Sequence, residues 1–370
     1  MKFCHLLWTL LATSSLTTEA FIAPSTPKNA FALRQTSNDE ISPVAELEEL
    51  LSNPLLSARA ARITAPLMSL LATGALTVPT AANAEGQQYP FAFDASRARY
   101  FPGSLPNSDV AQRIASTLRK REYRPYNTLV GSSLCSDEIN DTPQSLATDI
   151  QKKLVDVKDG GVFNLGGLGG LPFVGTSGFG AFLSHCPNSG KIFILFGPHV
   201  GISQEGVVGK VERIGVKKPS TSCGAAVGAY KALLAGADVT ATSTSSDFQE
   251  EYIIENLKKK LLPMSEMEEK GADDATAFIT KKMFDLVVEL MLANISTAVA
   301  KDGFWTKVSE ITLLGGIVIN RGHGEAARGG EDYFQPLMFK VLNEEGESDL
   351  YADVFRDLPT PVKCYTVVQG

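Results

Sequence analysis

The sequence predicts an α/β fold in which helices flank a sheet and ligands gather at the carboxyl ends of the strands. The unbroken apolar run Lys191 to Gly197 (KIFILFG) is typical of a fully buried strand. Further strand candidates alternate along the chain with segments that carry helix caps or helical apolar spacing. The composition, 44% hydrophobic and 20% charged, is that of a globular protein and excludes a disordered or collagen-like chain.

The first strand and helix of the folded region are expected between residues 126 and 160. Tyr126 to Leu134 is rich in β-forming residues, and Asp141 or Thr142 can cap a helix soon after it. The apolar positions of that helix share one face: Leu146, Ile150 and Leu154. A strand, a short loop and a helix in this order open a βαβ unit.

Glycine is frequent from Gly160 to Gly180, but without the spacing of a dinucleotide fingerprint and without a Gly-Lys-Ser/Thr sequence. These absences exclude a phosphate-binding loop, and we interpret the stretch as tight turns beside a site. Val207 to Ile214 is a further strand candidate. Cys223 begins a helix of small residues, CGAAVGAYKALLAG, that can pack closely on a sheet and ends at Gly236.

The last third of the chain adds helices from about Phe248 to Leu262 and from about Ala275 to Ala300. The second is apolar on most faces, which predicts a core helix or a subunit interface. Two strands follow, Ile311 to Ile319 and Leu337 to Leu342, and the connection between them opens with the glycine-rich turn Arg321 to Gly324.

The first 84 residues are expected to be targeting segments, which leaves residues 85–370 as one folded domain. Met1 to Ala20 has the form of a secretory signal, and Ile22 to about Ser37 lacks acidic residues as transit peptides do. Together they resemble the bipartite plastid presequences of algae with secondary plastids. The chain from Glu85 to Pro106 shows no clear periodicity, and we expect an extended lead-in there.

A second export signal is expected before residue 85. Arg59 and Arg62 precede the apolar segment Ala65 to Val78, and Ala82-Asn83-Ala84 offers a small-residue cleavage site. Such a signal would deliver the protein to the thylakoid lumen. The alternative is a surface helix or weak membrane anchor in a mature protein that begins near residue 38. No apolar stretch is long enough to predict a stable membrane span.

Charge and cysteine content narrow the function further. Residues 85–370 hold 29 basic and 35 acidic side chains, and this negative balance argues against a nucleic-acid partner. Five cysteines are too few for a disulfide scaffold in 370 residues. Metal binding or catalysis is therefore the expected use of the cysteines.

Cys135, His199 and Cys223 form a candidate metal site. The first two residues come just after predicted strands and the third begins a helix, so one edge of the sheet would gather all three. These are ligand types that zinc prefers, and three protein ligands with one open position are typical of catalytic zinc. Asp137, two residues beyond Cys135, can orient a reacting water or bind the metal in a resting form. Buried cysteines also serve as plain core residues, so the spacing alone leaves both interpretations open.

Several long motifs then make a resemblance specific. Cys135 to Asn140 (CSDEIN), Phe193 to Ser203 (FILFGPHVGIS) and Ser220 to Lys231 (STSCGAAVGAYK) resemble the limiting-CO2-inducible B family of algae and bacteria, also called theta carbonic anhydrases. The similarity covers roughly Tyr123 to Val341 and includes the later GGIVIN and DYFQP segments in the same order.

The resemblance implies a fold similar to the beta carbonic anhydrases, with a mainly parallel sheet, an obligate homodimer, and zinc held by Cys135, His199 and Cys223. Asp137 matches the family's active-site aspartate, which pairs with an arginine in the beta class. Ile139 occupies the position of that arginine here. Arg213 is our candidate for the missing partner, and a surface role for it is the alternative.

The implied activity is the reversible hydration of CO2 to bicarbonate by zinc-bound hydroxide, which forms near neutral pH because zinc lowers the pKa of water to about 7. The main alternative is a non-catalytic scaffold or bicarbonate sensor that keeps the zinc fold. A zinc hydrolase or deaminase is disfavoured, because His-Glu-x-x-His and the deaminase signature are missing.

Several other side chains have two interpretations each. Phe193, Phe196 and Val200 could line a CO2 pocket, with core packing favoured for the first two. His185 and His323 could shuttle protons or simply be solvated. Cys186 and Cys364 could form a redox-sensitive pair or remain separate thiols, and their spacing does not decide between these.

Overall fold

The computed structural model of the chain describes residues 89–142, 145–155, 161–242, 244–261, 266, 270–322, 330–361, 363 and 365–366. The targeting segments expected in residues 1–84 lie outside this part of the chain, as do His323 and Cys364.

One mixed sheet, with strands in the order β1-β9-β8-β4-β2-β3, forms the centre of the described region. Its strands are β1 (Leu105–Pro106), β2 (Thr128–Ser133), β3 (Phe163–Asn164), β4 (Gly190–Phe196), β5 (His199–Gly201), β8 (Val308–Asn320), β9 (Tyr333–Asn343) and β10 (Gly346–Asp349). The neighbours β3, β2, β4 and β8 are parallel, whereas β9 runs antiparallel to β8, β1 and β10. The predicted α/β fold with a mainly parallel sheet is therefore confirmed.

Two successive strands, β4 and then β5, pair with the same strand β8, and the break between them positions a site residue. Strand β4 follows β8 until Phe196, which lies opposite Gly315. After Gly197 and Pro198, strand β5 continues along β8, with His199 opposite Val318. A separate hairpin-like pair, β6 (Lys210–Val211) and β7 (Ser220–Thr221), lies between β5 and the helix that follows Cys223.

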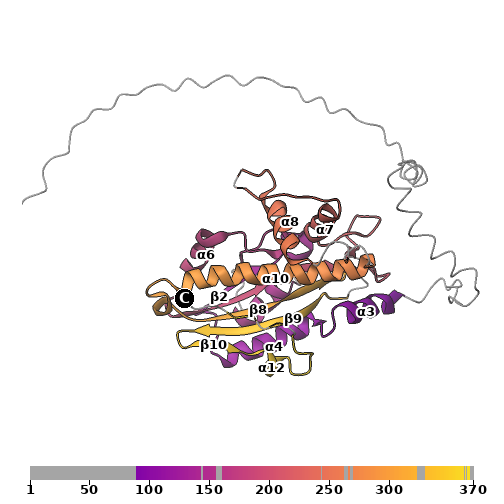
Figure 1. Cartoon of the computed structure of the whole chain (residues 1–370). Coiled ribbons are helices and arrows are strands. Elements are labelled where there is room, and N and C mark those ends of the chain that lie inside the picture. The colour runs from indigo at the N-terminus through magenta and orange to yellow at the C-terminus, as the bar shows by residue number, and fades with distance from the viewer. Residues whose placement is uncertain are drawn as a thin grey trace, which may run out of the picture. The chain divides into compact units, whose positions relative to one another are not determined.

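Helices cover both faces of the sheet (Figure 1). They are α3 (Tyr89–Tyr100), α4 (Asn107–Lys120), α5 (Leu146–Val155), α6 (Gly175–Ser184), α7 (Gly224–Leu234), α8 (Phe248–Lys260), α10 (Ala272–Val299), α11 (Phe304–Lys307) and α12 (Tyr351–Val354). The core on one face includes α6, α7, α8 and α10, and the core on the other includes α4, α5 and α12. No helix in the described residues is long and apolar enough to cross a bilayer.

Strand β4 shows how the sequence pattern produces two cores. Successive side chains of a strand point to opposite faces of the sheet. Ile192, Ile194 and Phe196 accordingly belong to the core beneath α10, and Phe193 and Leu195 to the core beneath α4 and α5. A strand buried on both faces has to be apolar throughout, which is why KIFILFG could be identified in the sequence.

The extended lead-in expected from Glu85 to Pro106 is wrong, because helix α3 occupies most of it. This helix is fixed by contacts with distant residues. Phe93 is fully buried, and its ring packs against the ring of Tyr333. The guanidinium of Arg321 lies over the Phe93 ring, 4.9 Å from its centre. Tertiary contacts of this kind outweigh a weak local pattern.

Two other predictions need correction. The stretch from Gly160 to Gly180 contains tight turns, with positive φ at Gly169 and Gly170, but it also contains the unpredicted helix α6 from Gly175. In the strand candidate from Val207 to Ile214, only Lys210 and Val211 form a strand, and the Ile214 side chain is exposed. The many glycines around α6 lower the local helix propensity, so the sequence does not predict this helix. Residues with β propensity form a strand only where another strand pairs with them.

Helix α4 precedes the first element that the sequence predicts, and it supplies much of the second core. Ile114 on this helix is fully buried, whereas Gln112 is exposed. We expect Ile114→Ala to lower the free energy of unfolding by about 2–5 kcal/mol, because it leaves a cavity in the core. Urea denaturation measures this loss. Gln112→Ala is the control and should change the value by less than about 0.5 kcal/mol, and equal effects of the two variants would contradict the burial of α4.

Candidate metal centre

The structure brings Cys135, His199 and Cys223 together at the carboxyl ends of the parallel strands. Cys135 follows β2, His199 begins β5, and Cys223 is the N-cap residue of α7. All three side chains are buried, and their potential ligand atoms lie within 4.8 Å of one another. These residues come from three separate segments of the chain, so the fold creates the cluster.

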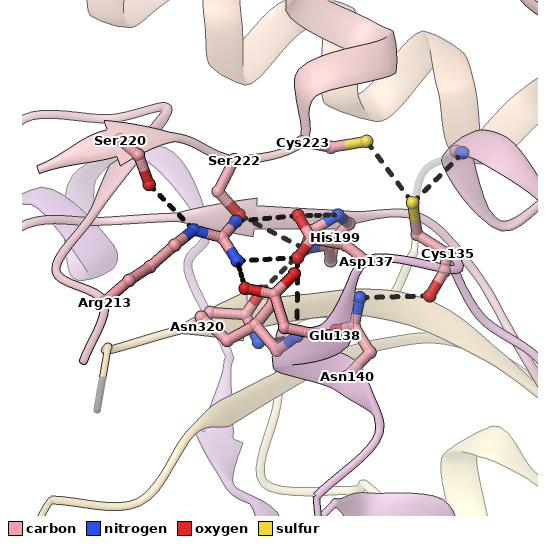
Figure 2. A network of polar contacts seen from close by, with 12 residues as sticks. Cys135, Asp137, Glu138, Asn140, His199, Arg213, Ser220, Ser222, Cys223 and Asn320 are labelled. Atoms are coloured by element: carbon pink, nitrogen blue, oxygen red, sulfur yellow. Dashed lines mark hydrogen bonds and ion pairs between the residues drawn. The ribbon is translucent and has the colours of Figure 1, made fainter. Parts of the chain in front are cut away.

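The two sulfur atoms face each other across the cluster (Figure 2). Their separation is 3.7 Å. In a tetrahedral site with Zn–S distances of about 2.3 Å, two sulfurs are roughly 3.8 Å apart. The backbone N–H of Gly169 also donates a hydrogen bond to Cys135 Sγ at 3.3 Å, which confirms that the glycine-rich turns lie beside the site.

The contact between the two cysteines shifts their pKa values in opposite directions even before a metal binds. The Cys135 thiol lowers the pKa of Cys223 by hydrogen bonding, and the N–H groups of Ala226 and Ala225 at the start of α7 act in the same direction against the effect of burial. The contact with Cys223, together with burial, raises the pKa of Cys135. The pair therefore retains a proton that metal binding is expected to release.

The ring of His199 is oriented by a chain of hydrogen bonds. Its Nδ1 lies 2.7 Å from Asn320 Oδ1. The amide of Asn320 is itself fixed, because its Nδ2 donates to Asp332 Oδ2 at 3.0 Å, and this leaves Oδ1 for the histidine. In the neutral imidazole, Nδ1 therefore carries the proton and Nε2 presents its lone pair to the cluster.

The Nε2 atom of His199 is buried and has no hydrogen-bond partner among the described residues. A buried polar atom without a partner is costly and is rare in native proteins. Although burial alone would lower the pKa of His199, the neighbouring Cys135 and Asp137 raise it. A buried lone pair beside two cysteine sulfurs is the donor set of a Cys2His zinc site, and the residues present fit that ion.

Asp137 lies beside the cluster and is held by Arg213. Arg213 Nη1 and Nη2 donate to the two carboxylate oxygens at 2.8 Å each. Asp137 Oδ2 is also 3.7 Å from His199 Nε2. Burial alone would raise the pKa of Asp137, but the hydrogen bonds and the positive charge of Arg213 lower it to about 2. Asp137 is therefore a carboxylate at neutral pH.

The position of Arg213 is fixed by further contacts. Its Nε donates to Ser220 Oγ at 2.7 Å, and its Nη1 also contacts Glu138 (Figure 2). Arg213 follows β6 and Ser220 lies in β7, so the small β6-β7 sheet carries the arginine to the aspartate. The pairing expected from the sequence is present, and the alternative of a free surface arginine is wrong.

The remaining expected residues lie elsewhere. Phe193 is in the core on the far face of the sheet from Cys135 and Cys223, and Phe196 stacks on Phe284, as core packing predicts. Val200 is buried in the same core as the cluster. His185 ends α6 with its ring against Phe163.

Cys186 is buried and forms no disulfide within the described residues, and burial raises the pKa of its thiol to about 11. Its suggested partner Cys364 and the second shuttle candidate His323 lie outside the described residues.

Asn320, Asp332 and Ser220 are site residues that the sequence did not single out. The available signal was weak: Asn320 is a polar residue at the end of a buried strand. We expect Asn320→Leu to weaken zinc binding by about 10–100-fold, because the His199 ring loses its orienting acceptor. Competition with a chelator measures the affinity. Asn256→Leu on α8 is the control, and unchanged zinc affinity in Asn320→Leu would contradict this role.

Comparison with known proteins agrees with this geometry. A family model described as limiting CO2-inducible proteins B/C beta carbonic anhydrases matches residues 104–343. A crystal structure of PtLCIB4, a homologue of the limiting CO2-inducible protein LCIB, is similar with a TM-score of 0.58 and 28% identity, covering 69% of this chain and 98% of that chain.

A PtLCIB4 mutant in which serine is replaced by arginine is similar with a TM-score of 0.53 and 26% identity, covering 70% of this chain and 98% of that chain. A search of curated protein sequences gives no significant match.

Proposed function

This chain belongs to the family of limiting CO2-inducible B/C beta carbonic anhydrases, and from this premise we propose that it is a zinc-dependent carbonic anhydrase that interconverts CO2 and bicarbonate. One observation carries the proposal beyond family membership. The Nε2 atom of His199, which has no hydrogen-bond partner in the described part of the chain, lies beside two cysteine sulfurs and near an aspartate that an arginine holds in place.

In this proposal, Cys135, His199 and Cys223 hold the zinc ion. Zinc, when bound at such a site, lowers the pKa of a water molecule to about 7 and thereby supplies a nucleophile near neutral pH. The two sulfurs contribute negative charge, and the Nδ1 hydrogen bond to Asn320 keeps the Nε2 lone pair directed at the ion. The three residues leave a fourth tetrahedral position for the reacting molecule.

Asp137 is proposed to orient the reacting water. Its carboxylate stays ionised and therefore accepts a hydrogen bond without donating one. Asp137 Oδ2 can therefore form a hydrogen bond only with a molecule that donates a proton. Because Arg213 engages both carboxylate oxygens, Asp137 is restrained from taking the fourth ligand position itself. A catalyst needs this position to remain open, whereas a scaffold or sensor does not.

Oxygen exchange between 18O-labelled bicarbonate and water tests the proposed reaction. The full chain, loaded with zinc, is expected to accelerate loss of label from CO2 far above the uncatalysed rate. Chelator-treated protein should lose this acceleration and regain it with added zinc. One zinc per chain without exchange, in both reducing and oxidising buffer, would instead favour a scaffold or bicarbonate sensor.

We propose that the active assembly is a homodimer located in the thylakoid lumen of a plastid. The targeting segments described from the sequence support the location, and the family resemblance supports the dimer. In an acidic lumen the dehydration of bicarbonate would be favoured, releasing CO2 for photosynthesis. A fluorescent fusion to the full chain should label the lumen, and a stromal or cytosolic signal would contradict this. Sedimentation should give twice the mass of one chain.

A further inference from the structure

A cavity of about 400 Å³ lies between α10, β9 and the C-terminal segment. None of its lining residues belongs to the metal cluster. Much of the wall is apolar: Pro102, Phe278, Phe284, Leu337, Tyr351 and Pro361. Its size and its apolar wall are those of a small-molecule site.

Lys363 and Tyr365 form part of the outer wall of the cavity. The ring of Tyr365 packs edge-on against Phe284 at 5.8 Å between centroids, and its hydroxyl donates to Asp285 Oδ1 at 2.5 Å. Lys363 Nζ donates to the other oxygen of the same carboxylate at 2.5 Å. Lys363 and Tyr365 are thus held against helix α10, although they lie far from it in the sequence, and they bound the cavity on this side.

The charged groups at the cavity are predominantly positive. Lys281, Lys282 and Lys363 line it together with one carboxylate, Asp285. That carboxylate already receives Lys363 and Tyr365, and Lys282 lies 3.9 Å from it. Lys281 has no carboxylate within ion-pair distance among the described residues, and its ammonium lies 5.7 Å from the centre of the Phe101 ring. The described residues of the cavity thus combine an apolar wall with three lysines and one carboxylate.

We propose that this cavity binds a small organic anion consisting of a carboxylate on an apolar body. Burying the apolar body against the phenylalanine, leucine and proline side chains provides affinity. The lysines favour a ligand with a negative charge, because Asp285 is the one carboxylate lining the cavity in the described part of the chain and it already receives Lys363 and Tyr365. The proposal is independent of the zinc site and its chemistry.

Titration calorimetry with 2-naphthoate and its neutral isostere 2-naphthamide tests the proposal on the full chain. We expect 2-naphthoate to bind one site per chain, and 2-naphthamide to bind at least about tenfold more weakly. Replacing both Lys281 and Lys282 by glutamine should reduce the affinity for 2-naphthoate to near that for the amide. Lys301→Gln, an exposed lysine outside the cavity, is the matched control and should change nothing.

Two further variants locate the binding. Leu337→Trp fills the cavity and should abolish binding of both compounds. Carboxylates can also bind zinc, and Cys223→Ala, which removes a proposed zinc ligand, tests this alternative. The variant should leave 2-naphthoate binding intact, because the cavity does not include the metal cluster. Equal affinity for the two compounds, no binding at all, or loss of binding in Cys223→Ala would each overturn the proposal. A Leu337→Trp variant that binds normally but sediments differently would assign this face to a second copy of the chain and would also overturn it.

Discussion

Replacing Cys223 by alanine is expected to remove zinc and abolish CO2 hydration. The variant leaves only Cys135 and His199 to hold the ion, and it removes the sulfur whose pKa is lowered by Cys135 and by the amides of α7. Zinc content should fall from about one per chain to below about 0.1. Without the metal the transition state loses several kcal/mol of stabilisation, which corresponds to a decrease of roughly 10³-fold or more in kcat/KM.

Cys186→Ala is the matched control for this experiment. Cys186 is also a buried cysteine, but it lies outside the cluster. Elemental analysis and stopped-flow hydration on the same samples should therefore give normal zinc content and rate for Cys186→Ala. A Cys223→Ala protein that keeps both zinc and activity would show that the metal, if bound, is held elsewhere.

The second large effect is expected from Arg213→Lys. Lysine keeps the positive charge but cannot donate two parallel hydrogen bonds to a carboxylate. Asp137 would then lose its fixed orientation and become free to approach the metal. We expect kcat/KM for CO2 hydration to fall by about 10²-fold, with zinc content unchanged, because the arginine positions Asp137 without binding the ion.

Arg121→Lys provides the control for the loss of a two-point contact. Arg121 also makes two hydrogen bonds to one carboxylate, that of Glu310, at 3.0 and 2.5 Å, and neither residue is part of the metal centre. This variant should lose some stability and keep its activity per folded chain. Full activity in Arg213→Lys would contradict the proposed role of the Arg213–Asp137 pair.

Local patterns of the sequence predicted that the three cluster residues lie together, and the family resemblance favoured a metal site over plain core cysteines. Cys135 and His199 come directly after strands, and Cys223 begins a helix, and in a parallel sheet such positions share one edge. The pairing of Arg213 with Asp137 could not be predicted from the spacing of residues. Nothing in its own segment indicates that β6 and β7 pair and direct its side chain at Asp137, and only the family resemblance prompted a search for an arginine.

The elements that the sequence analysis missed depend on distant contacts. Helix α3 has little apolar periodicity and is fixed by the burial of Phe93 against Tyr333. The antiparallel course of β9 is set by pairing with β8 and β10, which apolar content alone does not specify. The role of Asn320 depends on Asp332, which lies at the far end of the connection between β8 and β9 and orients the amide. Long-range pairing of this kind has no local signature.

The central claim is that zinc held by Cys135, His199 and Cys223 makes this chain a carbonic anhydrase, and metal titration tests it most directly. Zinc would be removed from the full chain with a chelator and restored in steps, with CO2 hydration followed by stopped flow at each step. The account predicts a rate that rises in proportion to bound zinc and levels off at one ion per chain, with no rise in Cys223→Ala. Zinc that binds at one per chain without any increase in rate would contradict it.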